Sequence, residues 1–187
     1  MTRPTLIIIT GPPGTGKTTL GNRIAASFSL PFLHKDGLKE LLFDALGWKD
    51  RSWSKQMSRV SYRLLFYVTE ILLSAGSSLV LEANFDAVAH SQTFIDLKGR
   101  CAYRPLQILC YAEGRILQRR FGQRGDSGRH PGHLDDVLRE ELEPLLRRGY
   151  TPPLDIGGRL VKVDTTDFGR VNTDDLLQAV RSVMAQE

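Results

Sequence analysis

The sequence predicts an α/β fold in which a parallel sheet is covered by helices on both faces. Five short apolar runs alternate along the chain with segments of helical periodicity. The first run lacks polar alternation, as is typical of a strand buried on both faces. A glycine-rich turn joins this run to the first helical segment. Sheets of this class bind ligands outside the carboxyl ends of their strands, where this turn is expected to lie.

The expected elements follow one another in chain order. Strands are expected at 6–10, 30–36, 78–83, 106–111 and 159–164. Helices are expected at 17–28, 37–47, 54–75, 87–100, 113–121 and 134–147, and a last one from about residue 173. Ser52 or Ser54 could cap the longest helix, and Pro144 should kink or break the sixth. The longest helix is expected to bury a stripe at spacings of three and four: Met57, Val60, Leu64, Tyr67, Val68, Ile71 and Ala75.

Size, charge and cysteine content narrow the class of protein. The 187 residues fit a single domain, 1–187. A net charge of +4 is too weak to indicate a nucleic-acid partner by itself. The two cysteines make no disulfide framework, and Cys110 lies in an apolar run. With no signal peptide and no apolar run near the roughly 20 residues of a membrane span, we expect a cytoplasmic monomer or dimer with no membrane partner.

The glycine-rich turn reads "GPPGTGKT" and fits the phosphate-binding pattern G-x-x-x-x-G-K-[ST] between a strand and a helix. Glycines let successive N–H groups point inward at phosphate oxygens, and the following helix adds positive charge at its N-terminus. Lys17 is expected to reach the β- and γ-phosphates and Thr18 to bind Mg²⁺. We therefore expect ATP and Mg²⁺ as cofactors. The expected nucleotide-binding residues of the turn are Gly11, Pro12, Pro13, Gly14, Thr15, Gly16, Lys17, Thr18 and Thr19.

Two acidic residues close the second and third apolar runs. Asp36 could orient an acceptor hydroxyl and accept its proton, or it could cap the helix that follows. Glu82 ends the third run, where an acidic residue can bind Mg²⁺ through water. Asn84 and Asp86 follow at the expected mouth of the site, and could contact the acceptor or cap the loop. We expect Asp36 to be catalytic, Glu82 to bind the metal and Asn84 to bind substrate.

An arginine- and glycine-rich segment, 119–134, is expected to form a lid. Arg120 ends a helix, and Arg124 and Arg129 follow it. Mobile arginines over a triphosphate neutralise the charge of the transferring group and exclude water. Arg120 and Arg124 are the expected catalytic arginines, Arg120 also binding the nucleotide, and Arg129 is expected to bind substrate. The alternative is a solvated basic loop.

The segment 36–76 is expected to cover the acceptor side. Two tryptophans there lie near basic residues spaced four apart, which could stack on a base or sugar and hold a phosphate: Trp48, Trp53, Lys55, Arg59 and Arg63. A solvated basic stripe is the favoured interpretation. The histidines are expected to lie separately on the surface and to form no zinc site: His90, His130 and His133.

Taken together, these motifs resemble the AAA-type P-loop kinases of the group that contains polynucleotide 5′-hydroxyl kinases, chloramphenicol phosphotransferase and zeta-toxin-type kinases. The matching stretches are "GPPGTGKTTL", "HKDGLKELL", "VLEANF" and the arginine lid, over essentially the whole chain. The resemblance implies a three-layer P-loop sandwich with strand order 2-3-1-4-5, a base at Asp36 and lid arginines at Arg120 and Arg124. Polynucleotide kinases typically have D-x-x-R, whereas Lys39 stands at the arginine position here.

Lysine lacks the bidentate fork of arginine, so a nucleic-acid acceptor is less favoured, although Lys39 is still expected to bind the acceptor. The expected function is ATP- and Mg²⁺-dependent transfer of the γ-phosphate to a hydroxyl of a small molecule or of a nucleic-acid 5′ end. One alternative is a nucleotide-dependent switch. The sequence lacks the base-reading motif N-K-x-D of GTPases, which makes this alternative less favoured. Another is a nucleoside monophosphate kinase, which would need acceptor-phosphate arginines near the second strand.

Overall fold

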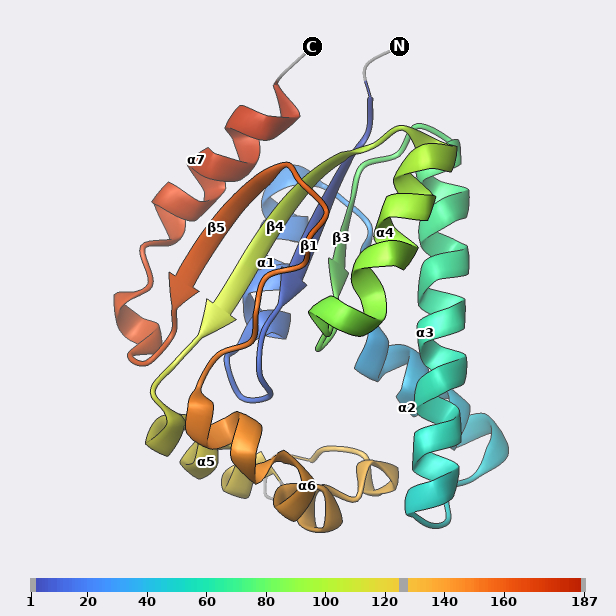
Figure 1. Cartoon of the computed structure of the whole chain (residues 1–187), viewed down its shortest axis with the longest axis vertical. Coiled ribbons are helices and arrows are strands. Elements are labelled where there is room, and N and C mark those ends of the chain that lie inside the picture. Colours follow the sequence, from blue (N-terminus) through green and yellow to red (C-terminus); the bar gives the residue numbers. More distant parts are fainter. Residues whose placement is uncertain (1–2, 125–127, 186–187) are drawn as a thin grey trace.

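A five-stranded sheet runs through the centre of the computed structural model, which describes residues 3–124 and 128–185. The strands pair in the order β2-β3-β1-β4-β5, all of them parallel, as expected. Figure 1 shows β3, β1, β4 and β5 side by side. Their bounds are β1 Thr5–Thr10, β2 Phe32–His34, β3 Leu79–Glu82, β4 Arg104–Tyr111 and β5 Arg159–Asp164. Every residue of β1 is buried, which explains why its sequence carries no polar alternation.

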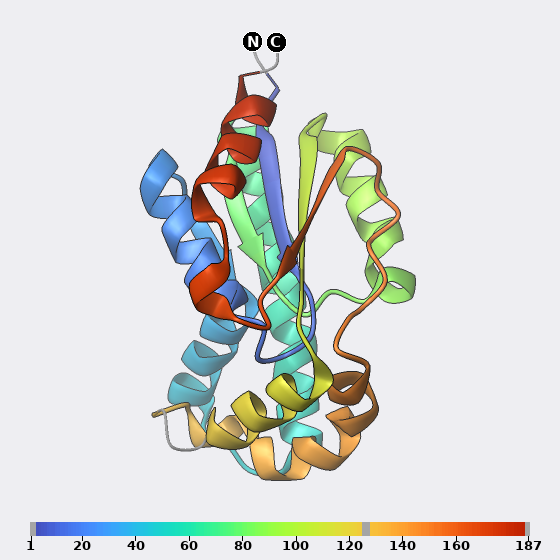
Figure 2. The ribbon, with the colours of Figure 1, turned by 90° about the vertical axis from the view of Figure 1, so that its left-hand side faces the viewer.

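Helices cover both faces of the sheet (Figure 2). Leu6 and Ile8 of β1 pack in one apolar cluster with side chains of α3 (Arg51–Ser74) and α4 (Ala87–Cys101). Ile7 and Ile9 pack on the opposite side with α1 and α7. The bounds of these last two helices are Lys17–Phe28 and Thr173–Met184. Burial of alternate β1 side chains on opposite faces thus holds the three layers together.

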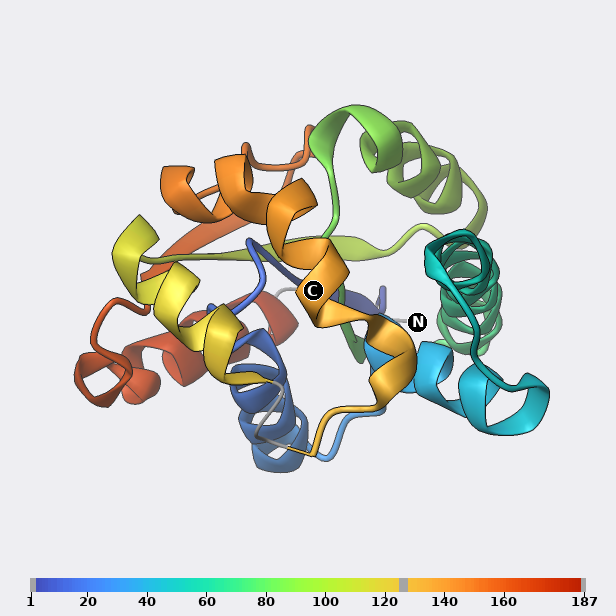
Figure 3. The same cartoon turned by 90° about the horizontal axis from the view of Figure 1, so that it is seen from below.

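The remaining helices gather at the carboxyl ends of the strands, below the arrowheads in Figure 1 and facing the viewer in Figure 3. They are α2 (Lys35–Leu46), α5 (Gly114–Gly122) and α6 (Asp135–Arg148). A small apolar cluster of its own joins α5 and α6, with Leu117, Phe121 and Leu146 at its centre. This end of the sheet is where a ligand site is expected in an open α/β fold.

The buried stripe expected on the longest helix is wrong except at Met57. α3 buries Ser54, Met57, Ser61, Leu65, Thr69 and Leu73, whereas Tyr67 and Ile71 are 65% and 50% exposed. Ser61 and Thr69 tolerate burial because their hydroxyls donate to the carbonyls of Met57 and Leu65, each at 2.7 Å. Small polar residues therefore alternate with Met57, Leu65 and Leu73 on the inward face, which is why apolar periodicity alone predicted the wrong face.

Helix ends also differ in detail from those expected. α3 begins at Arg51, and Asp50 rather than Ser52 or Ser54 caps it, accepting from the Trp53 N–H at 2.9 Å. α6 runs continuously through Pro144, so a break there is excluded. A short 3₁₀ turn, Pro131–His133, precedes α6 inside the expected lid, of which residues 125–127 lie outside the described part of the chain. None of the helices described is long and apolar enough to cross a bilayer.

Candidate active site

The glycine-rich turn between β1 and α1 forms a loop whose backbone needs glycine. Gly11 has φ +138°, and a Cβ there would lie 2.1 Å from the carbonyl oxygen of Cys110 on β4. Gly16 caps α1 with φ +73°, and a Cβ there would lie 2.3 Å from the ring of Phe168. Larger residues at either position would displace the loop, which fixes its backbone N–H groups at the start of α1.

Lys17 and Thr15 both fold back on the loop. The Lys17 ammonium donates to the carbonyl oxygen of Pro12 at 2.9 Å, and the Thr15 hydroxyl donates to the same oxygen at 2.8 Å. Burial lowers the pKa of Lys17, and the carboxylate of Glu82 partly offsets this. The Lys17 cation is thus desolvated and held beside the loop amides, which strengthens its attraction for an anion.

A cavity of about 420 Å³, the phosphate cavity, opens in front of this loop. The expected nucleotide-binding residues that line it are Gly14, Gly16, Lys17, Thr18, Thr19 and Arg120. The remaining ones do not line it: Gly11, Pro12, Pro13 and Thr15. Its other walls include Asp36, Glu82, Asn84, Arg124 and Arg129, so every expected catalytic, metal and substrate residue except Lys39 faces it.

The two expected metal ligands are in contact. The Thr18 hydroxyl donates to Glu82 Oε2 at 2.9 Å. This hydrogen bond joins the start of α1 to the end of β3. Hydroxyl and carboxylate oxygens are hard donors that suit Mg²⁺, which usually takes one or two protein ligands together with substrate phosphates. Among the described residues no group of three or more His, Cys, Asp or Glu side chains could hold a metal alone. The donor set therefore fits Mg²⁺ bound jointly by protein and phosphate.

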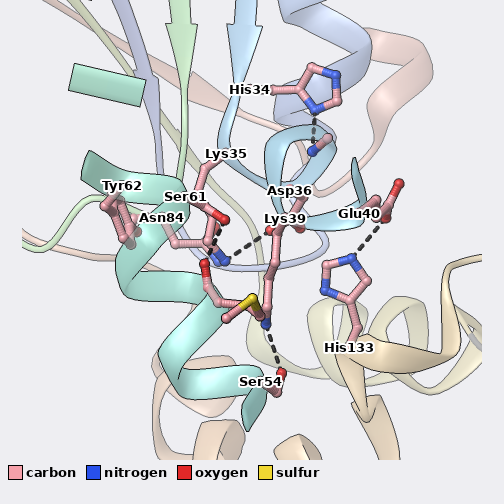
Figure 4. A network of polar contacts seen from close by, with 12 residues as sticks. His34, Lys35, Asp36, Lys39, Glu40, Ser54, Ser61, Tyr62, Asn84 and His133 are labelled. Atoms are coloured by element: carbon pink, nitrogen blue, oxygen red, sulfur yellow. Dashed lines mark hydrogen bonds and ion pairs between the residues drawn. The ribbon is translucent and has the colours of Figure 1, made fainter. Parts of the chain in front are cut away.

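Asp36 lies in the first turn of α2 rather than at the end of β2 as expected. β2 stops at His34, whose ring nitrogen Nδ1 accepts from the Gly37 N–H at 3.0 Å and caps the helix (Figure 4). Because His34 performs the capping, the Asp36 carboxylate is left to face the cavity. Its position near the helix N-terminus also favours its negative charge.

Basic side chains surround the Asp36 carboxylate. Burial alone would raise the pKa of Asp36, but Lys35 and Arg129 outweigh it and hold that pKa well below its usual range. The Lys35 ammonium lies 3.2 Å from Oδ1, and Arg129 donates to Oδ2 at 2.8 Å. Asp36 is therefore ionised throughout the neutral range, and it can accept a hydrogen bond from an incoming hydroxyl.

Lid arginines reach the cavity from two directions. Arg120 donates to the carbonyl oxygens of Gly14 and Thr166 at 3.3 and 3.2 Å, so it joins the phosphate loop to the segment after β5. The Arg124 guanidinium lies 5.4 Å from the centre of the Phe121 ring. Burial first, then Arg129, lowers the pKa of Arg124, which nevertheless stays a cation. The three arginines Arg120, Arg124 and Arg129 thus line one cavity.

A polar chain ties the lid to α2 through a histidine that the sequence analysis placed on the surface. His133 is only 2% exposed, so that expectation is wrong. Its Nδ1 lies 3.1 Å from Arg129 Nη2. Its Nε2 lies 2.8 Å from Glu40 Oε1, as Figure 4 shows. Arginine can only donate, so Nδ1 accepts and Nε2–H donates to Glu40. Burial lowers the pKa of His133 to about 3, which keeps the ring neutral.

Sequence reasoning missed His34, Glu40 and His133 as residues of this site. His34 and Glu40 line the phosphate cavity. His34 and Glu40 lie within the stretch "HKDGLKELL", but the stretch does not reveal what they do, because each acts through a contact made in the folded chain. His130 likewise stacks on Phe43 of α2, with ring centres 5.1 Å apart, and seats the lid segment there.

Beyond Asp36 lies a second, smaller cavity of about 130 Å³, the inner cavity. The two cavities share Asp36, Asn84, Arg124 and Arg129, which form the boundary between them. Lys39 lines the inner cavity but not the phosphate cavity. It is 3% exposed and donates to Ser54 Oγ at 2.8 Å. Asp86, by contrast, caps α4 by accepting from the Ala89 N–H at 2.9 Å, so of the two loop residues only Asn84 faces the cavities.

The tryptophan and basic segment after α2 lies largely outside both cavities. Lys55, Arg59 and Arg63 are exposed, and Lys55 lies 3.5 Å from Glu141 of α6. The Trp53 indole donates to the carbonyl oxygen of Gly47 at 2.9 Å, under the ammonium of Lys49. This arrangement agrees with the favoured interpretation of a solvated basic stripe.

Comparison with known proteins identifies the family. The AAA_33 model, described as an AAA domain, matches residues 6–151. A candidate kinase from Chloroflexus aurantiacus j-10-fl is 39% identical over 97% of this chain and 99% of that one, with a TM-score of 0.91. Kti12 from Chaetomium thermophilum, solved in complex with ADP-AlF3, is 16% identical over 97% and 100% of the two chains, with a TM-score of 0.68.

A curated relative matches only locally. Cytidylate kinase from Acidiphilium cryptum (strain JF-5) is 58% identical over 33 residues, which are 18% of this chain and 16% of that protein. The likeness to Kti12, at its low identity, shows the fold alone. The family model and the Chloroflexus structure, in contrast, each cover most of the chain. The chain therefore belongs to the AAA_33 family of AAA domains, in agreement with its resemblance to small AAA-type P-loop kinases.

Proposed function

We propose that this protein is an ATP- and Mg²⁺-dependent kinase that transfers the γ-phosphoryl group to a hydroxyl of a small molecule. One observation carries the proposal. Asp36 stands at the boundary between the phosphate cavity and the inner cavity, with Lys17 and Thr18 on one side and Lys39 on the other. A carboxylate between a triphosphate site and a second compartment is where a kinase needs its acceptor-orienting group.

In this proposal each residue acts on a stated atom. Lys17 and the loop N–H groups bind the phosphate oxygens, and Thr18 with Glu82 would hold Mg²⁺, which supplies charge neutralisation. Asp36 accepts a hydrogen bond from the acceptor hydroxyl and points its oxygen at the γ-phosphorus. The new O–P bond forms as the bond to the bridging oxygen of ADP breaks, and Arg120 and Arg124 neutralise the developing charge.

The depressed pKa of Asp36 bears on how it works. A carboxylate whose pKa is held well below the usual range is a weak base. Asp36 therefore orients the hydroxyl before the transfer and takes the proton only late. Phosphoryl transfer passes through a loose transition state in which the nucleophile need not be deprotonated early. Orientation therefore matters more than basicity at this position.

A γ-labelled ATP screen tests the proposal. The panel holds sugars, sugar acids, nucleosides, antibiotics, and RNA and DNA with 5′ hydroxyls, each incubated with the wild type and with Asp36→Asn. We expect label on at least one small hydroxyl compound and about a 100-fold or larger loss of turnover in Asp36→Asn, with the KM for ATP little changed. ATP hydrolysis that no acceptor stimulates, equal in the two proteins, would refute it and favour a nucleotide-dependent switch.

The same screen separates the remaining alternatives. A nucleoside monophosphate kinase would place label on a phosphate rather than on a hydroxyl, and inclusion of CMP distinguishes the two. A nucleic-acid kinase would label a 5′ hydroxyl in preference to every small compound. Neither is favoured, because Lys39, which lacks the bidentate fork of arginine, stands at the position of the acceptor-gripping arginine of polynucleotide kinases.

A further inference from the structure

The inner cavity carries more positive charge than its own carboxylates can balance. Its cationic lining residues are Lys35, Lys39, Arg51, Arg124 and Arg129, and its carboxylates are Asp36 and Asp135. His133 also lines it, but burial lowers the pKa of that ring to about 3, so it adds no charge near neutrality. From this excess we infer that the acceptor is a small hydroxy acid, carrying a carboxylate or phosphate beside the hydroxyl that receives the phosphoryl group.

The ion pairs among the described residues leave Lys39 without a carboxylate partner. Arg129 engages both lining carboxylates, at 2.8 Å from Asp36 and 2.9 Å from Asp135. Arg51 is turned to Glu141, which accepts from its guanidinium at 2.9 and 2.8 Å. Lys39 is within ion-pair distance of no carboxylate in the described parts of the chain, and its recorded hydrogen bond is to Ser54 Oγ at 2.8 Å. A buried ammonium in this situation favours a ligand that brings a negative charge.

The groups packed around Lys39 explain why an anion suits it. α2 contributes Lys35 and Asp36, α3 contributes Arg51 and Ser54, and the lid contributes Arg129 and His133. Burial, followed by the charge of Lys35, lowers the pKa of Lys39 to about 7; Asp36 opposes this shift, and Arg51 and Arg129 add to it. An anion seated beside the ammonium would reverse the shift and draw a proton onto Lys39.

Size and geometry set the other limit on the acceptor. The inner cavity is about 130 Å³ against about 420 Å³ for the phosphate cavity, and Leu138 and Leu142 of α6 close one side. A compound of a few carbons with its acid group at Lys39 could place a hydroxyl at Asp36, which lies three residues earlier on the same helix. An oligonucleotide end would need a longer, open groove than this one.

The inference rests on the proposed function and is tested by matched pairs of acceptors. The pairs are glycerate with glycerol, gluconate with glucitol, and ribose 5-phosphate with ribose, with γ-labelled ATP and the variants Lys39→Met and Lys98→Met. Lys98 is exposed on α4 and supplies the control. We expect the acid of at least one pair to be favoured in kcat/KM, and Lys39→Met to raise its KM about tenfold or more without changing the KM for ATP. Lys98→Met should match the wild type.

A binding measurement covers the case in which none of these acids is the substrate. Protein saturated with Mg²⁺ and a non-hydrolysable ATP analogue is titrated calorimetrically with inorganic phosphate and with D-glycerate. We expect one of these anions to bind, more weakly at pH 8.5 than at pH 6, and the binding to be lost in Lys39→Met but kept in Lys98→Met. Melting curves verify that Lys39→Met is folded.

The results distinguish failure of this inference from failure of the proposed function. Equal or better use of the neutral partners, a 5′-hydroxyl oligonucleotide preferred to every small acid, or acid binding that Lys39→Met leaves intact would each overturn the hydroxy-acid assignment while leaving a kinase. Absence of phosphate and glycerate binding in the saturated protein would also overturn it. Only a failure of every acceptor, together with unstimulated ATP hydrolysis, would remove the kinase itself.

Discussion

Arg129 of the lid donates to Oδ2 of Asp36 at 2.8 Å, so a residue 93 positions later in the chain holds the carboxylate that faces both cavities. Arg129 is in turn fixed by Asp135 at 2.9 Å and by His133 at 3.1 Å. The lid segment and Asp36 therefore form one polar unit. Movement of the lid would release Asp36, and closure of the lid would restore its charge environment.

Replacing Arg129 should change the pH at which the enzyme loses activity in acid. In the proposed mechanism Asp36 acts when it is ionised, and its pKa, held well below the usual range, keeps it so in weakly acidic solution. Arg129→Met removes a cation that lowers this pKa, so the acid limb of kcat/KM should move to higher pH. A pH–rate profile with the best acceptor measures the shift. Arg119→Met, at an exposed arginine of α5, is the control, and equal acid limbs in all three proteins would contradict the prediction.

Loss of the Thr18 hydroxyl should weaken the use of Mg²⁺. Thr18 Oγ1 and Glu82 Oε2 are 2.9 Å apart, and both oxygens fit a hard divalent ion. We expect Thr18→Ala to raise the Mg²⁺ concentration needed for half-maximal activity about tenfold or more. Thr18→Ser keeps the hydroxyl and should stay within a fewfold of the wild type. Similar Mg²⁺ dependence in Thr18→Ala and Thr18→Ser would show that the hydroxyl is not a ligand.

Lys39 should make folding stability depend on pH. Its pKa is about 7 in the folded protein against an ordinary value of 10.5, so between these values the unfolded chain binds more protons. The penalty for burying Lys39 is therefore present in full below pH 7 and is relieved as the pH rises toward 10.5. Urea unfolding of the wild type and Lys39→Met measures this.

Relative to Lys39→Met, we expect the unfolding free energy of the wild type to rise by roughly 1–3 kcal/mol between pH 7 and pH 9.5. The difference between the two proteins isolates this residue from the other titrating groups. A difference that stays constant over this range would mean that Lys39 keeps an ordinary pKa in the folded state.

Local sequence patterns were sufficient for the sheet and the phosphate loop. Each strand is an apolar run, and the glycine-rich turn follows the first of them, so neighbours in the chain determine both structure and chemistry there. The strand order came from the resemblance. The buried face of α3 could not be predicted from local patterns, because Ser61 and Thr69 are polar and only tertiary packing turns them inward.

The residues around Asp36 were also difficult to predict from the sequence, because they meet only in the folded chain. His133 is buried because the lid docks on α2, where the histidine contacts Glu40, and this contact joins residues 93 positions apart. No spacing in the sequence reports such a contact. Asp36 could be predicted as a site residue because it follows the second apolar run. Its carboxylate faces the cavity because His34 caps α2 in its place, and histidine is not among the residues preferred for capping.

Gly132 should be required for the lid to dock on α2. A Cβ at this position would lie 2.7 Å from the ring of Phe43, which is itself buried. Gly132→Ala would therefore push the lid away from α2 without altering any charge. Arg129 and His133, on either side of Gly132, would move with it, and displacement of positioned groups by about 1 Å can cost about 100-fold in rate.

We accordingly expect Gly132→Ala to lower kcat/KM for the acceptor at least about tenfold, with a smaller effect on the KM for ATP. Gly99→Ala on α4 is the matched control, because a Cβ there meets nothing within 4 Å. An alanine inside a helix stabilises it by up to about 1 kcal/mol over glycine, so Gly99→Ala should melt slightly higher and keep wild-type kinetics. Wild-type kinetics in Gly132→Ala would show that the lid works without its contact to Phe43.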